Sequence, residues 1–334
     1  MQVHLIDGTY ELFRAWFGAP PAQHAGREVG AVRSLVRSLA MLLGRGTITH
    51  AGVAFDHVIE SFRNDLFAGY KTGEGVPEGL FAQFELAERA VTAMGLVAWP
   101  MIEFEADDAI GTAAHHLAND PAVEQVRITA VDKDMCQCVI GTRVVCWDRF
   151  KDVVLDEAAV VAKHGVMPAS IPDLLALVGD TADGIPGLPG WGKSSAAKVL
   201  AVYGTLDAIP DDHATWSLKL RGADRLAATL REQRTEATLY RLLATLARLS
   251  IVCDAVAWRS IAAIRPGDRA RCRLDPPTAI RTQMVVDLAA RAQGRAGCAV
   301  GARSSGPPGP VRRLLNNSSC GYSSPSCSRL RPPP

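Results

Sequence analysis

Short apolar runs alternate with stretches of helical periodicity over the first 150 residues. Runs with the length of buried strands lie at 2–7, 51–56, 96–99, 125–132 and 142–147. Between them, apolar residues recur every three or four positions, which predicts helices over about 10–17, 29–43, 81–94, 105–118 and 133–140. This alternation is typical of an α/β fold with a mainly parallel sheet flanked by helices.

From about residue 155 the pattern becomes helical throughout. Helices are predicted over 154–165 and 171–179, another opens at Lys193, and one or two span 223–248. We therefore expect an α/β domain over 1–165 and a helical domain over 166–260. Residues 265–334 are rich in Gly, Ser, Pro and Arg without an apolar period, which predicts a disordered basic tail or tether.

Composition excludes several classes of protein. The 334 residues leave room for two domains, and 48% apolar with 21% charged residues is typical of a soluble globular protein. No uninterrupted apolar run of about 18 residues predicts a membrane span. The N-terminal MQVHLIDGTYELF lacks a basic leader, so we expect a cytoplasmic protein. The eight cysteines include no C-x-x-C pair, which argues against structural zinc.

Charge is distributed unevenly along the chain. Twelve arginines and three aspartates follow residue 264, so residues 1–264 carry a net charge of about −8 in a chain of net charge +1. An acidic body can still bind a phosphate where its carboxylates hold divalent cations. The net charge therefore does not exclude nucleic acid as a partner.

Three predicted strands end in an aspartate: Asp7, Asp56 and Asp132. Ligands of parallel α/β sheets bind outside the carboxyl ends of the strands, so we expect these side chains to converge. Capping of the next helix would explain one such aspartate and is a poorer explanation for three. Six further acids join the candidate cluster: Glu105, Asp107, Asp108, Asp134, Asp180 and Asp183.

Clustered carboxylates repel one another, and hard divalent cations relieve the repulsion. The sequence therefore predicts Mg²⁺ ligands, with two ions that could activate water and stabilise the leaving oxygen of a phosphodiester, and Mn²⁺ as a substitute. Arg63 and Lys71 lie in the irregular segment 57–80, and either could stabilise charge on the phosphate. A solvated face is the alternative for Arg63. Tyr70 or Phe67 could stack on an unpaired base.

A glycine- and proline-rich turn precedes a helix in the stretch Gly179 to Leu200. Glycines let backbone N–H groups approach a partner closely, and a helix N-terminus favours phosphate. The alternative is an ordinary turn followed by a capped helix. The candidate DNA-binding residues are Gly187, Gly190, Gly192, Lys193, Ser194 and Lys198.

These motifs, taken in order, resemble the 5′-3′ exonuclease and flap endonuclease family, which includes the N-terminal nuclease domain of bacterial DNA polymerase I. The resemblance covers about residues 1–255. It rests on LIDG at 5–8, SFRNDLFAGYK at 61–71, EADD at 105–108, DKD at 132–134 and GDTADGIPGLPGWG at 179–192.

The resemblance implies a PIN-like sheet in a catalytic domain over 1–165, with an arch at about 63–84. It also implies a helix–three-turn–helix element at about 185–200 that grips duplex DNA, with K⁺ in its loop. All nine acids named above become metal ligands, and Lys71 and Arg63 become catalytic. We expect a stand-alone monomeric nuclease that acts on DNA duplexes with a 5′ flap or 5′ end, or on RNA–DNA hybrids, in replication or repair, without a membrane or an obligate protein partner.

Two residues depart from the family pattern. Glu74 stands where relatives usually carry an arginine three residues after the arch lysine, and Gly184 replaces the asparagine of the D-N-I-P run. Two alternatives remain open. One is a PIN-type ribonuclease on single-stranded RNA, against which the predicted duplex clamp argues. The other is a non-catalytic protein that binds DNA junctions.

Overall fold

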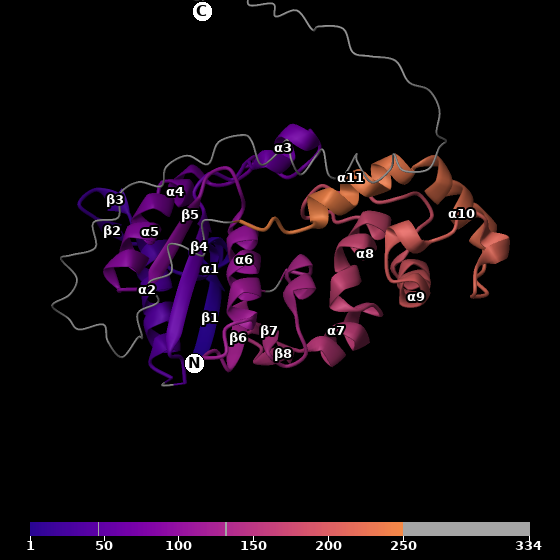
Figure 1. Cartoon of the computed structure of the whole chain (residues 1–334). Coiled ribbons are helices and arrows are strands. Elements are labelled where there is room, and N and C mark those ends of the chain that lie inside the picture. Colours follow the sequence, from indigo (N-terminus) through magenta and orange to yellow (C-terminus); the bar gives the residue numbers. More distant parts are fainter. Residues whose placement is uncertain (46, 131, 250–334) are drawn as a thin grey trace, which may run out of the picture. The chain divides into compact units, whose positions relative to one another are not determined.

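A six-stranded sheet forms the centre of the N-terminal half (Figure 1). The computed structural model describes residues 1–45, 47–130 and 132–249, which lie within one compact unit. The strands run in the order β5-β4-β1-β6-β7-β8, and all neighbours are parallel except β7 and β8. Their bounds are β1 Gln2–Asp7, β4 His50–Asp56, β5 Val97–Met101, β6 Gln125–Thr129, β7 Val144–Asp148 and β8 Val153–Leu155. The predicted mainly parallel sheet is confirmed.

Helices cover both faces of this sheet. The helices α1 (Gly8–Gly18), α2 (Gly30–Leu43) and α5 (Phe84–Ala93) share one apolar core with β4. Ile6 of β1 belongs to this core. The helix α6 (Ala106–Ala118) packs on β1, β4, β5 and β6, and most of its residues are buried. Figure 1 shows α6 between the sheet and the later helices.

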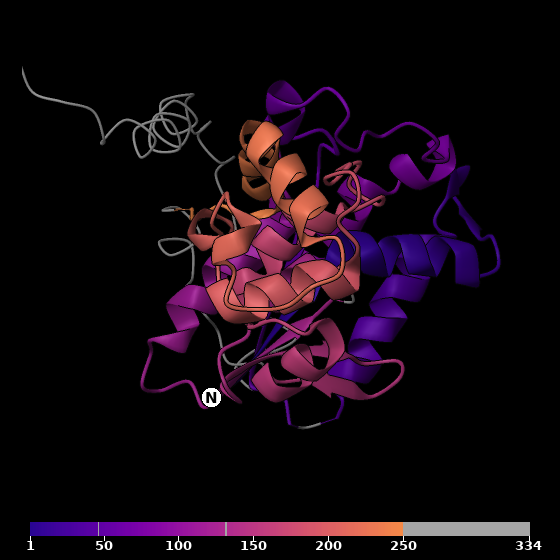
Figure 2. The same cartoon turned by 90° about the vertical axis from the view of Figure 1, so that its right-hand side faces the viewer.

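The second half is helical, as the periodicity predicts. In the view of Figure 2 these helices stand in front of the sheet. Their bounds are α7 Glu157–His164, α8 Ile171–Val178, α9 Lys193–Tyr203, α10 Ala223–Glu232 and α11 Arg234–Ala244. The helix α8 packs against α9 and α11. It also contacts the short 3-10 helix η1 (Asp134–Cys138), which connects the helical half to the end of the sheet.

The irregular segment after β4 contains two short helices, α3 (Phe62–Leu66) and α4 (Glu78–Phe81). Ser61 begins α3 with a capping box, in which the Asn64 side chain accepts from the Ser61 N–H at 2.8 Å. The segment was predicted as irregular, and its short helices were not.

Two predictions about local structure are wrong. The strand β6 ends at Thr129, so Asp132 does not end a strand but lies beyond it in the connection to η1. The helix predicted over 133–140 is a single stretch of 3-10 helix. Two other features were not predicted, the hairpin of β2 (Gln23–His24) with β3 (Arg27–Glu28) and the antiparallel edge strand β8.

The turn between α8 and α9 is held closed by glycines. Gly179 and Gly187 have φ angles of +87° and +71°. A Cβ on Gly187 would lie 2.4 Å from the Gly179 nitrogen, and one on Gly179 would lie 2.6 Å from the Pro186 oxygen. Only glycine fits at both positions because a side chain would overlap backbone.

The predicted tail at 265–334 and the last residues of the predicted domain 166–260 lie outside the described residues. Among the residues that the structure does describe, no helix is both long and apolar enough to span a membrane.

Candidate active site

Asp7 and Asp56 end adjacent parallel strands, β1 and β4, at the same edge of the sheet. One Asp7 carboxylate oxygen accepts from the Tyr10 N–H at 2.9 Å, so Asp7 caps α1. Asp56 instead reaches the first turn of α6, where its Oδ1 accepts from the Ala106 N–H at 2.7 Å. Capping of the next helix along the chain therefore explains the position of Asp7 but not that of Asp56, which contacts α6 instead.

Gly8 lets the start of α1 approach β4. A Cβ on Gly8 would lie 2.5 Å from the Phe55 ring and 2.8 Å from the Ala54 oxygen. Glycine is therefore required directly after Asp7 because a side chain at residue 8 would overlap β4.

The aspartates at this edge influence one another electrostatically. Burial raises the pKa of Asp7 well above its usual range, and the charges of Asp56 and Asp132 raise it further. Asp107 behaves in the same way, because burial and then the charges of Asp134 and Asp7 raise its pKa. The predicted convergence of Asp7, Asp56 and Asp132 is supported by these interactions.

Burial also raises the pKa of Asp134 to about 8, with Asp183 and Asp132 adding to the effect. The pKa values of Asp56 and Asp132 rise as well, chiefly through burial. Burial and mutual repulsion therefore disfavour the ionised form of these carboxylates when no cation is bound.

Lys71 supplies positive charge to the cluster. Its ammonium lies 2.9 Å from Glu105 Oε2 and 3.0 Å from Asp183 Oδ1. Lys71 also works to lower the pKa of Asp7, Asp56, Asp107, Asp132 and Asp134. The lysine predicted as catalytic thus lies among the predicted metal ligands.

Glu105 pairs with two cations and a hydroxyl group. Besides Lys71, it contacts the Arg63 guanidinium at 3.2 Å and accepts from Ser61 Oγ at 2.7 Å. Burial works to raise the pKa of Glu105, but Arg63 and Lys71 outweigh it, and the pKa falls below its usual value. Ser61 was not predicted as a site residue, although its place at the start of the SFRNDLF run is a capping signal.

Asp108 and Arg63 form a buried ion pair away from solvent, which corrects two predictions. Arg63 donates to both Asp108 oxygens at 2.8 and 2.7 Å, and the side chains are 1% and 0% exposed. Asp108 also accepts from the N–H groups of Glu105 and Ala247. Its oxygens are fully used, so Asp108 is not placed to bind a metal ion. Arg63 cannot reach a substrate phosphate from this position.

Arg63 additionally joins the segment after β4 to the C-terminal end of α11. It donates to the Leu243 oxygen at 2.8 Å and the Thr245 oxygen at 3.1 Å. These partners are 180 and 182 residues away in sequence, so no local pattern could reveal them.

The remaining two acids lie in the turn after α8. Asp180 is buried and its Oδ1 lies 2.6 Å from the Lys133 ammonium. Lys133 lies between Asp132 and Asp134 in the DKD motif and was not predicted as a site residue. Asp183 pairs with Lys71 as described. Two lysines therefore connect the Asp180–Asp183 turn to the edge of the sheet.

The donor set fits a hard divalent cation. Carboxylate oxygens are the ligands that Mg²⁺ prefers, and Asp107 Oδ1 is buried without a hydrogen-bond partner. Among residues 1–45, 47–130 and 132–249, however, no three His, Cys, Asp or Glu side chains are arranged to hold one metal ion. The carboxylates are gathered at one edge, and several of them are held by Lys71, Lys133 and Arg63 instead of sharing one centre.

Tyr70 does not present its ring to a base. It is 5% exposed, and its hydroxyl contacts Glu105 Oε2 at 3.3 Å. The prediction that Tyr70 stacks on an unpaired base is therefore wrong for this arrangement, because the ring is covered by protein. Sequence alone does not distinguish a buried tyrosine from an exposed one at an irregular position.

The predicted DNA-binding residues divide by exposure. Gly190, Gly192, Lys193, Ser194 and Lys198 are exposed around the start of α9. Ser195 stabilises this helix start, since the Gly192 N–H donates to Ser195 Oγ at 3.1 Å. Gly187 is buried against the end of α8 and serves packing, which corrects its assignment as a DNA contact.

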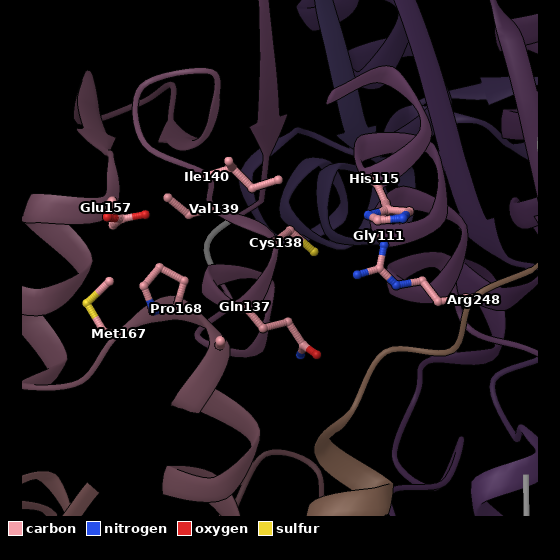
Figure 3. Close-up of a pocket in the computed structure, with 11 residues that line it drawn as sticks. Gly111, His115, Gln137, Cys138, Val139, Ile140, Glu157, Met167, Pro168 and Arg248 are labelled. Atoms are coloured by element: carbon pink, nitrogen blue, oxygen red, sulfur yellow. The ribbon is translucent and has the colours of Figure 1, made fainter. Parts of the chain in front are cut away.

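A cavity of about 260 Å³ lies beside α6 and is separate from the acidic residues (Figure 3). Figure 3 shows His115 and Arg248 on one side of it and Glu157 and Met167 on the other. None of the predicted site residues lines this cavity. The predicted site residues therefore lie outside this cavity.

Comparison with known proteins agrees with the arrangement of these motifs. Residues 2–165 match the model of the 5′-3′ exonuclease N-terminal resolvase-like domain, and residues 166–261 match that of the 5′-3′ exonuclease C-terminal SAM fold. The chain is 34% identical over 214 residues to a 5′-3′ exonuclease from Buchnera aphidicola, covering 61% of this chain and 68% of that protein.

DNA polymerase I from Pseudomonas aeruginosa is 36% identical over 252 residues, which cover 72% of this chain. This chain spans about a quarter of the polymerase, since 27% of its length is covered.

Solved structures share the fold at low sequence identity. The 5′-exonuclease of bacteriophage T5 with bound zinc ions has a TM-score of 0.58 at 19% identity, over 77% of this chain and 93% of that one. A T5 flap endonuclease complex with DNA and metal ions gives 0.58 at 17% identity, with the same coverage. Together, the ordered acidic motifs, the sheet and helical halves, and the matches over both show that the chain belongs to the 5′-3′ exonuclease family.

Proposed function

We propose that this protein is a divalent-metal-dependent, structure-specific 5′ nuclease that hydrolyses phosphodiesters near the 5′ ends and flaps of duplex DNA. The observation that carries the proposal is the gathering of Asp7, Asp56, Asp107 and Asp134 with Lys71 at the carboxyl edge of the sheet. RNA–DNA hybrids belong to the same substrate class. We further propose that the protein acts as a monomer.

The residues best placed to hold divalent cations are those whose pKa is raised by burial and by neighbouring carboxylates: Asp7, Asp56, Asp107, Asp132 and Asp134. Glu105, Asp180 and Asp183 lie around them and would contribute through water or by orienting lysines. Two Mg²⁺ ions, or Mn²⁺ in their place, would supply an activated water and neutralise the leaving oxygen.

Lys71 is the side chain best placed to meet the scissile phosphate. Its side chain is 31% exposed, whereas the Arg63 side chain is 1% exposed. A cation at this position stabilises the charge that develops on the phosphate oxygens. Lys71 is therefore the catalytic cation in this proposal, and Arg63 supports the fold.

The start of α9 would hold the duplex at a fixed distance from this edge. Lys193, Ser194 and Lys198 are exposed there, and the free N–H groups of the helix start favour a phosphate. The proposal includes a K⁺ ion in the preceding turn, as the family resemblance implies. Backbone contacts of this kind position the duplex without reading its sequence.

The test is cleavage of a 5′-flap duplex, labelled at its 5′ end, with Mg²⁺ and with a chelator, by wild type and by Asp132→Ala. We expect cleavage near the junction by the wild type with Mg²⁺ alone. Activity that survives both chelation and the substitution contradicts the proposal. Faster cleavage of unpaired RNA than of the flap would instead favour a single-strand ribonuclease.

A further inference from the structure

The base of the arch segment is seated directly on the turn that carries Asp183. The Lys71 N–H donates to the Asp183 oxygen at 3.1 Å, and the Lys71 ammonium lies 3.0 Å from Asp183 Oδ1. The Asn64 side chain donates to the Lys71 oxygen at 2.9 Å, which fixes the other side of this residue. Backbone and side chain of Lys71 are thus held together against one turn.

Gly184 is the residue that lets the two segments approach this closely. Its φ is +72°, and a Cβ on it would lie 2.1 Å from the Gly69 oxygen and 3.5 Å from the Lys71 nitrogen. The overlapping atom belongs to the backbone, so any side chain at 184 must push residues 69–71 away. Asparagine adopts the same left-handed conformation at little cost. A substitution by asparagine therefore tests the steric overlap with the Gly69 oxygen and not the ability of residue 184 to adopt a positive φ.

Seated in this way, Lys71 pairs with two carboxylates that surround the proposed metal ligands, and its charge acts on those ligands. Its ammonium lies within 3.0 Å of both Glu105 and Asp183, and its charge lies among those of the five aspartates above. An ammonium group and a metal ion that share carboxylates compete for them, and the competition is reciprocal.

We propose that Gly184 is a positioning residue that seats Lys71 among the carboxylates, so that Lys71 and the divalent cation compete for the same acidic cluster. The inference rests on the proposed metal-dependent function and deepens it. It assigns a role to the one position of the turn that departs from the family's asparagine. With a divalent cation bound at the acidic cluster, the Lys71 ammonium would be free to contact the phosphate of the substrate.

The test is a titration of the full chain with Mn²⁺ in the absence of DNA, in which electron paramagnetic resonance measures the bound ion. The variants are Gly184→Asn, Lys71→Met, their combination, and Gly222→Asn as the matched control. Gly222 has a φ of +74° and nothing within 4 Å of the position of a Cβ, so it shares the conformation without the contact. Unfolding midpoints by circular dichroism confirm that each variant is folded. The smaller Gly184→Ala replaces Gly184→Asn if the latter does not fold.

We expect Gly184→Asn and Lys71→Met each to lower the Kd for Mn²⁺ by about tenfold. The double variant should bind no more tightly than Lys71→Met, because Gly184 acts through Lys71. Gly222→Asn should bind like the wild type. A Kd for Mn²⁺ of Gly184→Asn equal to that of Gly222→Asn overturns the proposal. A double variant whose decrease in Kd equals the product of the decreases in the two single variants also overturns it.

The outcome also separates this inference from the function on which it rests. If no variant and no wild-type protein binds Mn²⁺, the metal-dependent function itself fails. If the wild type binds Mn²⁺ and cleaves the flap but Gly184→Asn leaves the affinity unchanged, only the positioning role is lost.

Discussion

Replacement of Arg63 by methionine separates a structural role from a catalytic one. The Arg63 guanidinium is 1% exposed and donates to Asp108, Leu243 and Thr245. Without it, the Asp108 carboxylate stays buried at 0% exposure with an uncompensated charge. Breaking a buried pair in this way costs about 3–5 kcal/mol of unfolding free energy. For the roughly 250 residues that the structure describes, this corresponds to a fall in Tm of roughly 6–20 °C.

The assay is thermal and urea unfolding in the presence of a chelator, with Asp108→Asn and the double variant completing a cycle. Each single substitution should be strongly destabilising, and the double variant should lose clearly less than the sum, because the second change removes the stranded partner. Lys71→Met serves as the comparison, since its partly exposed side chain should cost little stability while cleavage falls about 10²–10³-fold.

The cleavage rate and the stability of Arg63→Met together decide whether Arg63 contacts the phosphate. If Arg63→Met unfolds like the wild type and loses cleavage as Lys71→Met does, then Arg63 contacts the phosphate. The interpretation drawn from the sequence alone would then be right, and the buried pair would not persist in the active enzyme.

Three further predictions follow from the same geometry. Burial raises the pKa of Asp134 to about 8, so between about pH 4 and pH 8 the folded state holds one more proton than the unfolded state. The free energy of unfolding without metal therefore falls as the pH rises through this range. Asp134→Asn should flatten this pH dependence in thermal unfolding with a chelator. Gly187→Ala should be several times more destabilising than Gly190→Ala, because only Gly187 has backbone within 2.4 Å of its Cβ position, as urea unfolding would show. Lys198→Ala should weaken flap binding and reduce the slope of log affinity against log salt by about 1, and an unchanged slope would exclude a phosphate contact.

The periodicity of apolar residues was sufficient for most of the fold. Strands such as Gln2–Asp7 are buried along nearly their whole length, and helices such as Gly30–Leu43 bury one face, so both leave a local signal. The strand Val153–Leu155 and the hairpin at residues 23–28 are too short and too exposed to leave one. The extension of β6 to Asp132 was wrong because the apolar run continues past the last residue that pairs with β1.

The acidic residues of the candidate site were predictable from the sequence, whereas the residues that pair with them were not. Asp7 and Asp56 follow from the rule that parallel strands present their carboxyl ends at one edge. The pairing of Asp108 with Arg63 joins residues 45 apart, and the fixation of Arg63 by Thr245 joins residues 182 apart. Whether a carboxylate faces a metal ion or an arginine depends on such contacts, and a sequence motif does not contain them.

The most direct test of the central claim is the single-turnover rate on a 5′-flap DNA duplex, compared with the same strand unpaired, for wild type and Asp7→Asn at saturating Mg²⁺. We expect the wild type to cleave the flap near the junction and the unpaired strand much more slowly. The rate for Asp7→Asn should approach that of the wild type in a chelator. Equal rates on the paired and unpaired strands, or an Asp7→Asn variant as fast as the wild type, would contradict it.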